Sequence, residues 1–173
     1  MGFFGTSMLI RADVDVTALD IVRDAGGTPD GGWVGKDGWR FARVHRGDPL
    51  TAEHVRAVAD QVNAPFLAAY VVDSDFVEVR CAAPGMSVLR FVLQPLYAAD
   101  YDCPVDSHAQ EAAVPYLLRW AGEGADEALL RAAVQGCLRF AEDSVVRLAA
   151  AIGAITASDL RDYTFGPIED IHT

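Results

Sequence analysis

Three apolar segments that follow one another between residues 65 and 94 constrain the fold more than any other stretch of this sequence. They span residues 66–72, 76–82 and 87–94. Asp73-Ser74-Asp75 joins the first two segments, and Ala83-Pro84-Gly85 joins the second pair. These residue types are typical of tight hairpin connections. The stretch therefore predicts a three-stranded antiparallel meander.

The first two segments differ in how their apolar residues are distributed. Nearly every position of 66–72 is apolar, whereas Val77 and Val79 alternate with Glu78 and Arg80 in the second segment. A continuous apolar run is typical of a strand covered on both faces, and alternation is typical of one covered on a single face. We expect the sheet to be buried at the first strand and to face water toward the edge beyond it.

Patterns on either side of the meander add further elements. Residues 3–12 and 39–45 are strand-like, a capping box at Thr17 and Asp20 predicts a short helix, and Thr51 opens a longer helix ending before Pro65. The order predicts an α+β fold, with a largely antiparallel sheet of about five strands covered by helices. Residues 26–38 hold six glycines. Because they lack the spacing of phosphate-binding loops, we interpret them as a flexible connector.

The C-terminal half is predicted to be helical after a long irregular segment. Residues 96–109 show no periodicity and are interpreted as a loop, and residues 112–121 as a helix. Apolar residues then recur at intervals of three and four through 126–152. Gly136 interrupts this pattern, and one bent helix is favoured over two. Residues 158–173 are predicted to be an irregular tail of a single α+β domain that spans residues 1–173.

Composition excludes some classes of partner and compartment. Asp and Glu number 25 against 14 Lys and Arg, a net charge of −11 that disfavours nucleic acid and anionic membrane as partners. The three cysteines, Cys81, Cys103 and Cys137, are an odd number far apart in sequence, and the first residues show no secretory pattern. This combination favours free thiols and a cytoplasmic location.

The charge distribution points to a contact surface. Residues 91–118 contain no Lys or Arg. They carry acidic residues with tyrosines between them: Tyr97, Asp100, Tyr101, Asp102, Asp106 and Glu111. Carboxylates steer a basic protein toward the surface, and tyrosine rings supply contact area. We expect these six residues to bind a basic protein partner; the alternative is a solvated acidic loop that serves solubility.

Catalytic chemistry has weaker support. Cys103, Ser107 and His108 form the one local cluster of a thiol, a hydroxyl and an imidazole. The main alternative function is therefore an enzyme or small-molecule-binding domain with a Cys/His/Asp pocket between the sheet and the C-terminal helices. A third possibility is an oligomerising domain whose long helix makes a self-contact. No catalytic residue, cofactor or metal site is assigned, because matched ligand pairs are absent from the sequence.

Part of the chain resembles a known group of proteins. The resemblance lies in the sequence PFLAAYVVDSD at 65–75, Pro84-Gly85, and the late helix with Phe140-Ala141-Glu142-Asp143. Over about half of its length, the chain is similar to small actinobacterial immunity partners of polymorphic toxins. The resemblance implies an acidic α+β protein that blocks a toxin domain by covering its active site and has no catalytic residues of its own. It carries over no interface residue.

Overall fold

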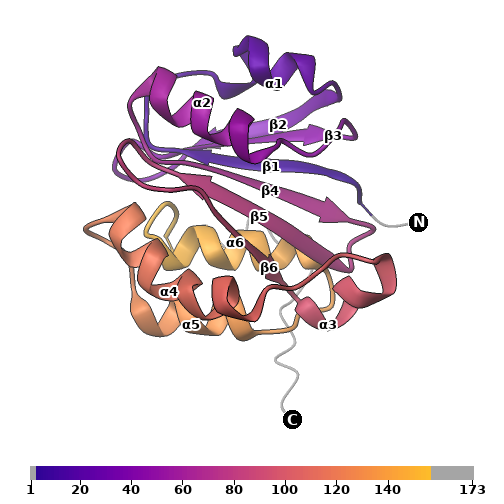
Figure 1. The fold of residues 1–173 in the computed structure, drawn as a ribbon. Helices are drawn as coiled ribbons and strands as arrows, with labels where there is room; N and C mark the ends of the chain where they lie inside the picture. Colours follow the sequence, from indigo (N-terminus) through magenta and orange to yellow (C-terminus); the bar gives the residue numbers. More distant parts are fainter. Residues whose placement is uncertain (1–2, 157–173) are drawn as a thin grey trace.

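The computed structural model describes residues 3–156 and contains one six-stranded antiparallel sheet (Figure 1). The strands are β1 (Gly5–Ile10), β2 (Thr28–Val34), β3 (Arg40–His45), β4 (Phe66–Val72), β5 (Phe76–Ala82) and β6 (Leu89–Leu93). Their order across the sheet is β2-β3-β1-β4-β5-β6, and β4-β5-β6 form the predicted meander. The α+β fold is confirmed, with one strand more than predicted. The predicted tail at 158–173 lies outside the described residues.

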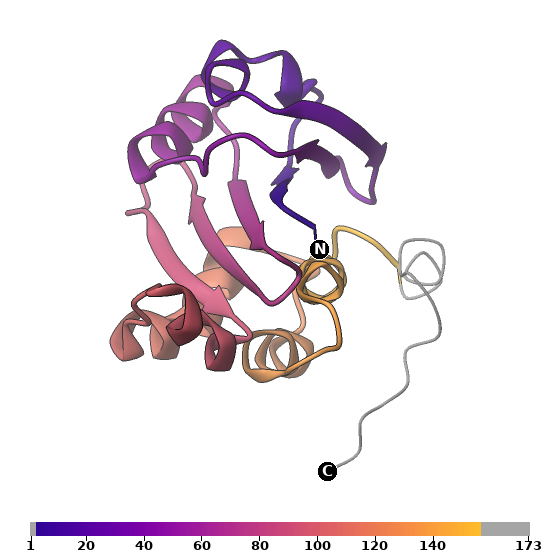
Figure 2. The ribbon, with the colours of Figure 1, turned by 90° about the vertical axis from the view of Figure 1, so that its right-hand side faces the viewer.

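Helices cover both faces of the sheet. They are α1 (Asp20–Asp24), α2 (Ala52–Val62), α3 (Pro95–Ala98), α4 (Ser107–Ala121), α5 (Glu127–Gln135) and α6 (Ala141–Ala151), with 3-10 turns η1 (Val16–Ala18) and η2 (Ala99–Tyr101). Figures 1 and 2 show α1 and α2 on one side of the sheet and α4, α5 and α6 on the other. As predicted, Thr51 caps α2, and its side chain accepts a hydrogen bond from the amide of His54.

Strand β4 separates the two main cores. Leu67 and Val71 point toward the α4–α6 layer, and both are fully buried. Phe66 and Ala68 alternate with them and pack into the core beneath α2. Successive side chains of a strand point to opposite faces. The prediction that β4 is covered on both faces is therefore confirmed.

The second face of β5 is less exposed than its alternation predicts. Instead of facing open water, the side chains of Glu78 and Arg80 are only 14% and 19% exposed. They form an ion pair, and Arg80 Nη1 also donates a hydrogen bond to the carbonyl of Leu50 at 3.0 Å. Because the two charges compensate each other, this face can be covered without leaving an isolated charge.

The glycine-rich segment contains an edge strand, which corrects the prediction of a flexible connector. Strand β2 pairs with β3 alone, and the register shifts between Pro29 and Gly32. Proline is tolerated at the edge of a sheet, and a bulge accepts an extra residue. Gly31 has a φ of +88°, in the left-handed region that glycine adopts without strain. Pro29 and Gly31 therefore shape this strand instead of preventing it.

The C-terminal helical segment also differs from the prediction of one bent helix. Helix α5 ends at Gln135, Gly136 has an extended backbone with ψ of 157°, and α6 begins at Ala141. The amide of Asp126, which caps α5, donates to the carbonyl of Ala151 at the end of α6 (2.8 Å). The two helices therefore run antiparallel.

Two helix starts are corrected as well. Asp15, not Thr17, caps the first turn, which is η1: its carboxylate accepts a hydrogen bond from the Thr17 amide at 3.0 Å. Helix α1 begins separately at Asp20. The segment predicted as a loop over 96–109 contains α3, η2 and the first residues of α4. Helix α4 begins at Ser107 rather than at 112, because the Asp106 carboxylate caps it.

Candidate functional site

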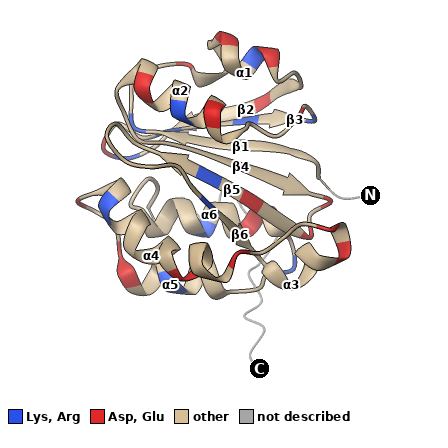
Figure 3. Cartoon of the chain, in the orientation of Figure 1, with Lys and Arg blue, Asp and Glu red and all other residues tan. Residues whose placement is uncertain are grey.

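The six residues predicted to bind a partner all lie on the surface. Tyr97, Asp100, Tyr101, Asp102, Asp106 and Glu111, which we call the acidic edge, are exposed in and around α3, η2 and the start of α4. Figure 3 shows Asp and Glu residues along this connection, at the end of the sheet where β4 turns into β5. Within residues 3–156, no Lys or Arg forms an ion pair with any of its four carboxylates.

The end of the acidic edge nearest α4 is fixed to the edge of the sheet. The side-chain amide of Gln110 accepts a hydrogen bond from the Val92 amide at 3.1 Å and donates one to the Val92 carbonyl at 2.7 Å. The side chain thus pairs with β6 as a neighbouring strand would. It satisfies backbone groups at an otherwise open edge and fixes the first turns of α4 beside the sheet.

An arginine from β6 holds the middle of the same connection. Arg90 Nη1 donates to the carbonyl of Pro104 at 2.9 Å, and its Nε donates to Glu78 Oε2 at 2.9 Å. Although burial opposes its charge, the hydrogen bonds and charge of Glu78 raise the pKa of Arg90 above its ordinary value. A partly buried ionic cluster of Glu78, Arg80 and Arg90 therefore holds the backbone between Asp102 and Asp106 through the Pro104 carbonyl.

The turn between β4 and β5 extends the acidic edge. No sequence pattern indicated this contribution of the turn. The hydroxyl of Tyr101 donates to Asp75 Oδ2, and this hydrogen bond is the main cause that raises the pKa of Tyr101 to about 12. The charges of Asp73, Asp75 and Asp100 act on the same phenol. Asp73 and Ser74 both have positive φ, as a type I′ hairpin turn requires. Asp75 therefore orients one of the two tyrosines of the predicted surface.

The carboxylates of the acidic edge have different roles. Asp106 caps α4 by accepting the amides of His108 and Ala109 at 2.9 and 3.2 Å, so its first role is structural. Among the described residues, the side chains of Asp100, Asp102 and Glu111 form no hydrogen bond or ion pair. These three carboxylates are available to an incoming partner.

The structure does not bring Cys103 and His108 together in a pocket. Cys103 Sγ accepts from Arg90 Nη2 at 3.2 Å and lies 3.9 Å from Glu78 Oε2, whereas His108 is exposed on the first turn of α4. Burial raises the pKa of the Cys103 thiol above its ordinary value, with Arg90 acting in the opposite direction. A catalytic thiol needs a lowered pKa. This arrangement does not favour the Cys/His/Asp pocket.

The rates at which the three cysteines react with a thiol reagent test the interpretation that Cys103 is not an activated thiol. We expect a thiol-specific reagent at pH 8 to modify the exposed Cys137 first, Cys103 roughly tenfold more slowly, and the fully buried Cys81 only after unfolding. Because the pKa of Cys103 is raised, its rate should keep rising at higher pH. Mass spectrometry of timed samples identifies each site. Fastest modification at Cys103 would instead support an activated thiol.

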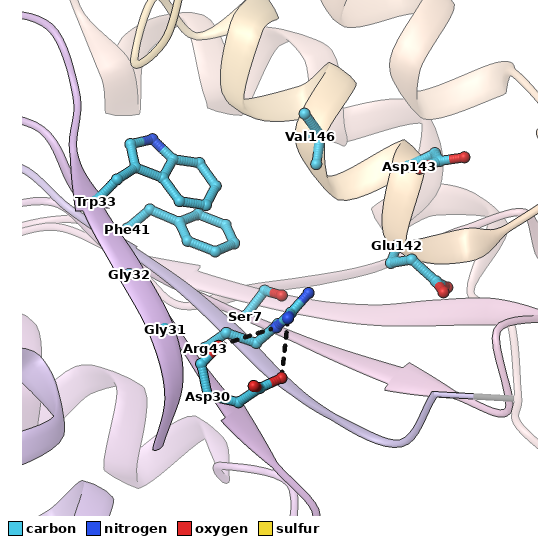
Figure 4. A pocket seen from close by; sticks show the side chains of 10 residues that line it. All are labelled: Ser7, Asp30, Gly31, Gly32, Trp33, Phe41, Arg43, Glu142, Asp143 and Val146. Atoms are coloured by element: carbon cyan, nitrogen blue, oxygen red, sulfur yellow. Dashed lines mark hydrogen bonds and ion pairs between the residues drawn. The ribbon is translucent and has the colours of Figure 1, made fainter. Parts of the chain in front are cut away.

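A cavity of about 280 Å³ opens on the α4–α6 face of the sheet, between the β2–β3 hairpin and α6 (Figure 4). Its lining residues come from four elements: Ser7 of β1; Asp30, Gly31, Gly32 and Trp33 of β2; Phe41 and Arg43 of β3; and Glu142, Asp143 and Val146 of α6. No sequence pattern indicates this cavity, because one of its walls belongs to the segment interpreted as a loop. Its volume is near the lower limit for ligand sites.

Known proteins give no guide to function, since no protein-family model, curated protein or solved structure matches this chain. Within residues 3–156, His, Cys, Asp and Glu side chains form no group of three or more that could hold a metal ion. In the same range, every helix is too short or too polar to cross a membrane. The geometry of the acidic edge and of the cavity is therefore the structural information that bears on function.

Proposed function

We propose that this chain is a non-enzymatic binding protein whose acidic edge binds a basic protein partner. The observation that carries this function is the set of exposed carboxylates of Asp100, Asp102 and Glu111, which have no compensating cation among the described residues. An acid kept only for solubility can be anywhere on the surface. Asp100 and Asp102 lie at the start of the connection that Arg90 holds at Pro104, and Glu111 lies in the first turns of α4, which Gln110 holds beside β6.

The fixed backbone of the acidic edge favours recognition over a purely solvating role. A surface that is ordered before binding loses little conformational entropy when the partner arrives. Tyr97 and Tyr101 are 42% and 39% exposed, so each presents part of its ring beside the carboxylates. Negative potential steers a cationic partner toward the site, and the rings then add contact area.

For the class of partner, we propose the one that the resemblance of residues 65–75, 84–85 and 140–143 to immunity proteins implies. This partner is a basic toxin domain, which the chain neutralises by covering its active site. Such a role requires binding and no chemistry from this chain. It agrees with the raised pKa of Cys103.

Charge reversal at the acidic edge tests the proposed function. With the basic protein encoded next to this gene as the probe, we expect Asp100→Lys/Asp102→Lys to weaken binding at least about tenfold, because each reversal replaces an attraction with a repulsion. The matched control is Asp24→Lys/Asp60→Lys, an equal change of charge at exposed positions of α1 and α2 in the opposite helix layer. Calorimetry at low and high salt gives both affinities and their salt dependence.

Equal affinities of the two double variants would contradict this location of the interface. A wild-type affinity that does not fall with added salt would contradict the electrostatic mechanism. No interaction with the neighbouring gene product would remove the immunity role. Circular dichroism of each variant shows that a lost interaction is not a lost fold.

A further inference from the structure

The cavity between β2 and α6 is lined by a hydroxyl group from the sheet. Ser7 is only 2% exposed and is one of the lining residues (Figure 4). A serine hydroxyl can both donate and accept a hydrogen bond. It therefore offers a polar contact to a ligand with a hydrogen-bonding group.

The charges around the cavity favour a positive ligand. Arg43, its only cationic lining residue, is already held by Asp30: the two side chains form an ion pair at 2.9 Å, and Arg43 Nε donates to the Asp30 carbonyl at 3.3 Å. Glu142 and Asp143 add two carboxylates on the α6 wall. The four charged groups of the lining therefore carry a net negative charge. Arg147, on the same helix, acts on Asp143 but does not line the cavity.

Glu142 has an unfilled position for a donor. Its Oε1 accepts a hydrogen bond from Ser74 Oγ at 3.0 Å, whereas its Oε2 is buried without a partner among the described residues. A carboxylate oxygen that is removed from water and left unpaired is costly. A cationic donor bound beside Glu142 would supply the partner that this oxygen lacks.

The opposite wall of the cavity is apolar. The rings of Trp33 and Phe41 are stacked with their centroids 3.7 Å apart. Val146 faces them from α6 across the cavity (Figure 4). An aliphatic stem would bury its surface between these side chains while its polar end faced the carboxylates.

We propose that this cavity binds an alkylguanidinium or alkylammonium group, with the stem against Trp33, Phe41 and Val146 and the cation directed toward Ser7 and Glu142. The cavity shares no lining residue with the acidic edge, and its ligand does not depend on the proposed partner; Ser74, which contacts Glu142, belongs to the turn that extends this edge. Its ligand is either a small amine or guanidine, or the side chain of a lysine or arginine in a polypeptide. Either source presents the same chemistry to the cavity.

Tryptophan fluorescence of the full chain measures this binding. Trp33 is half-buried beside the cavity, whereas Trp39 and Trp120 are only 2% exposed, so Trp33 should report the ligand. We expect butylguanidine and butylamine to give a saturable change with a millimolar dissociation constant, as fragments of this size can. Pentanoate and 1-pentanol, which have similar stems without the positive charge, should bind at least about tenfold more weakly.

Substitutions place the signal in the cavity. Trp33→Phe should remove the fluorescence change without preventing binding, which calorimetry then follows. Glu142→Gln keeps the acceptor for Ser74 and removes the charge, and Ser7→Val removes the hydroxyl and fills space; each should weaken butylguanidine binding at least about tenfold. The matched control is Glu53→Gln, an exposed acid of α2 on the other face of the sheet, which should leave the affinity unchanged.

A peptide probe separates the two sources of the cation. An acetylated and amidated Gly-Gly-Arg-Gly-Gly that binds more tightly than butylguanidine would indicate the side chain of a polypeptide, and the reverse order would indicate a small molecule. The site would be overturned by equal binding of pentanoate, by no saturable change with either cation, or by affinities that Glu142→Gln and Ser7→Val leave unaltered. None of these outcomes bears on Asp100 and Asp102.

Discussion

Replacing Trp120 with alanine should lower the free energy of unfolding by about 4 kcal/mol, the largest effect expected for a single substitution in this chain. Trp120 lies on α4 and is 2% exposed. Its ring contacts that of Trp39 with centroids 5.3 Å apart, and its Nε1 donates to the Ala82 carbonyl at 2.7 Å. The substitution removes a large buried surface and leaves a buried carbonyl without its donor.

One further variant separates the causes of this loss, and a second serves as a control. Trp120→Phe retains most of the ring and removes the donor, so it should cost about 2 kcal/mol. Leu129→Ala, on the neighbouring helix α5, removes a side chain that is 54% exposed and should change stability by less than about 0.5 kcal/mol. Urea denaturation measures all three. A loss at Trp120→Ala no larger than that at Leu129→Ala would show that α4 does not pack on the sheet as described.

The central meander could be predicted because its information is local. Strand segments 66–72 and 76–82 are apolar and rich in β-branched residues, and the turn at 73–75 has residue types that hairpins favour. Each signal is contained within a few neighbouring residues. The strand pairing then follows from the short connection, since two consecutive strands joined by a tight turn must pair as antiparallel neighbours.

Strand β2 and the break between α5 and α6 could not be predicted, for different reasons. Edge strand β2 is compatible with Pro29 and Gly31 because it needs hydrogen bonds from β3 alone and because a bulge absorbs the extra residue. On either side of the break between α5 and α6, Leu130 in α5 and Leu148 in α6 are both fully buried in the same core. Two antiparallel helices that bury one face each can continue a single apolar period across the break.

The candidate site could be predicted only in part, because its local features are visible in the sequence and its long-range contacts are not. The exposure of the acidic edge follows from its composition, but what holds it in place does not. Arg90 meets Pro104, Gln110 meets Val92, and Tyr101 meets Asp75 only after the chain has folded. The cavity could not be predicted, because its lining residues Ser7 and Glu142 come from opposite ends of the sequence.

Substitution of Glu78 by glutamine is the second large expected effect, with a loss of roughly 3 kcal/mol in the free energy of unfolding. The Glu78 side chain is 14% exposed and pairs with both Arg80 and Arg90. Removing its charge leaves two largely buried guanidinium groups without a counter-ion. Breaking a buried pair in this way costs more than the pair itself contributes.

The same change should loosen the acidic edge. Arg90 joins β6 to the carbonyl of Pro104 through a hydrogen bond. Among the described residues, Glu78 supplies the only carboxylate that pairs with Arg90. In Glu78→Gln, we therefore expect faster amide exchange between residues 102 and 106, and weaker partner binding although no carboxylate of the acidic edge has changed. Hydrogen exchange with mass spectrometry resolves this segment.

A matched control separates this partly buried cluster from an ordinary surface ion pair. Glu127→Gln on α5 breaks a pair with Arg131 whose side chains are 61% and 55% exposed, so it should cost less than about 0.5 kcal/mol. Equal losses for the two variants would mean that Glu78 is no more than a surface charge. A large loss of stability at Glu78→Gln with unaltered exchange at residues 102–106 would show instead that the ionic cluster stabilises the sheet without positioning the surface proposed to bind the partner.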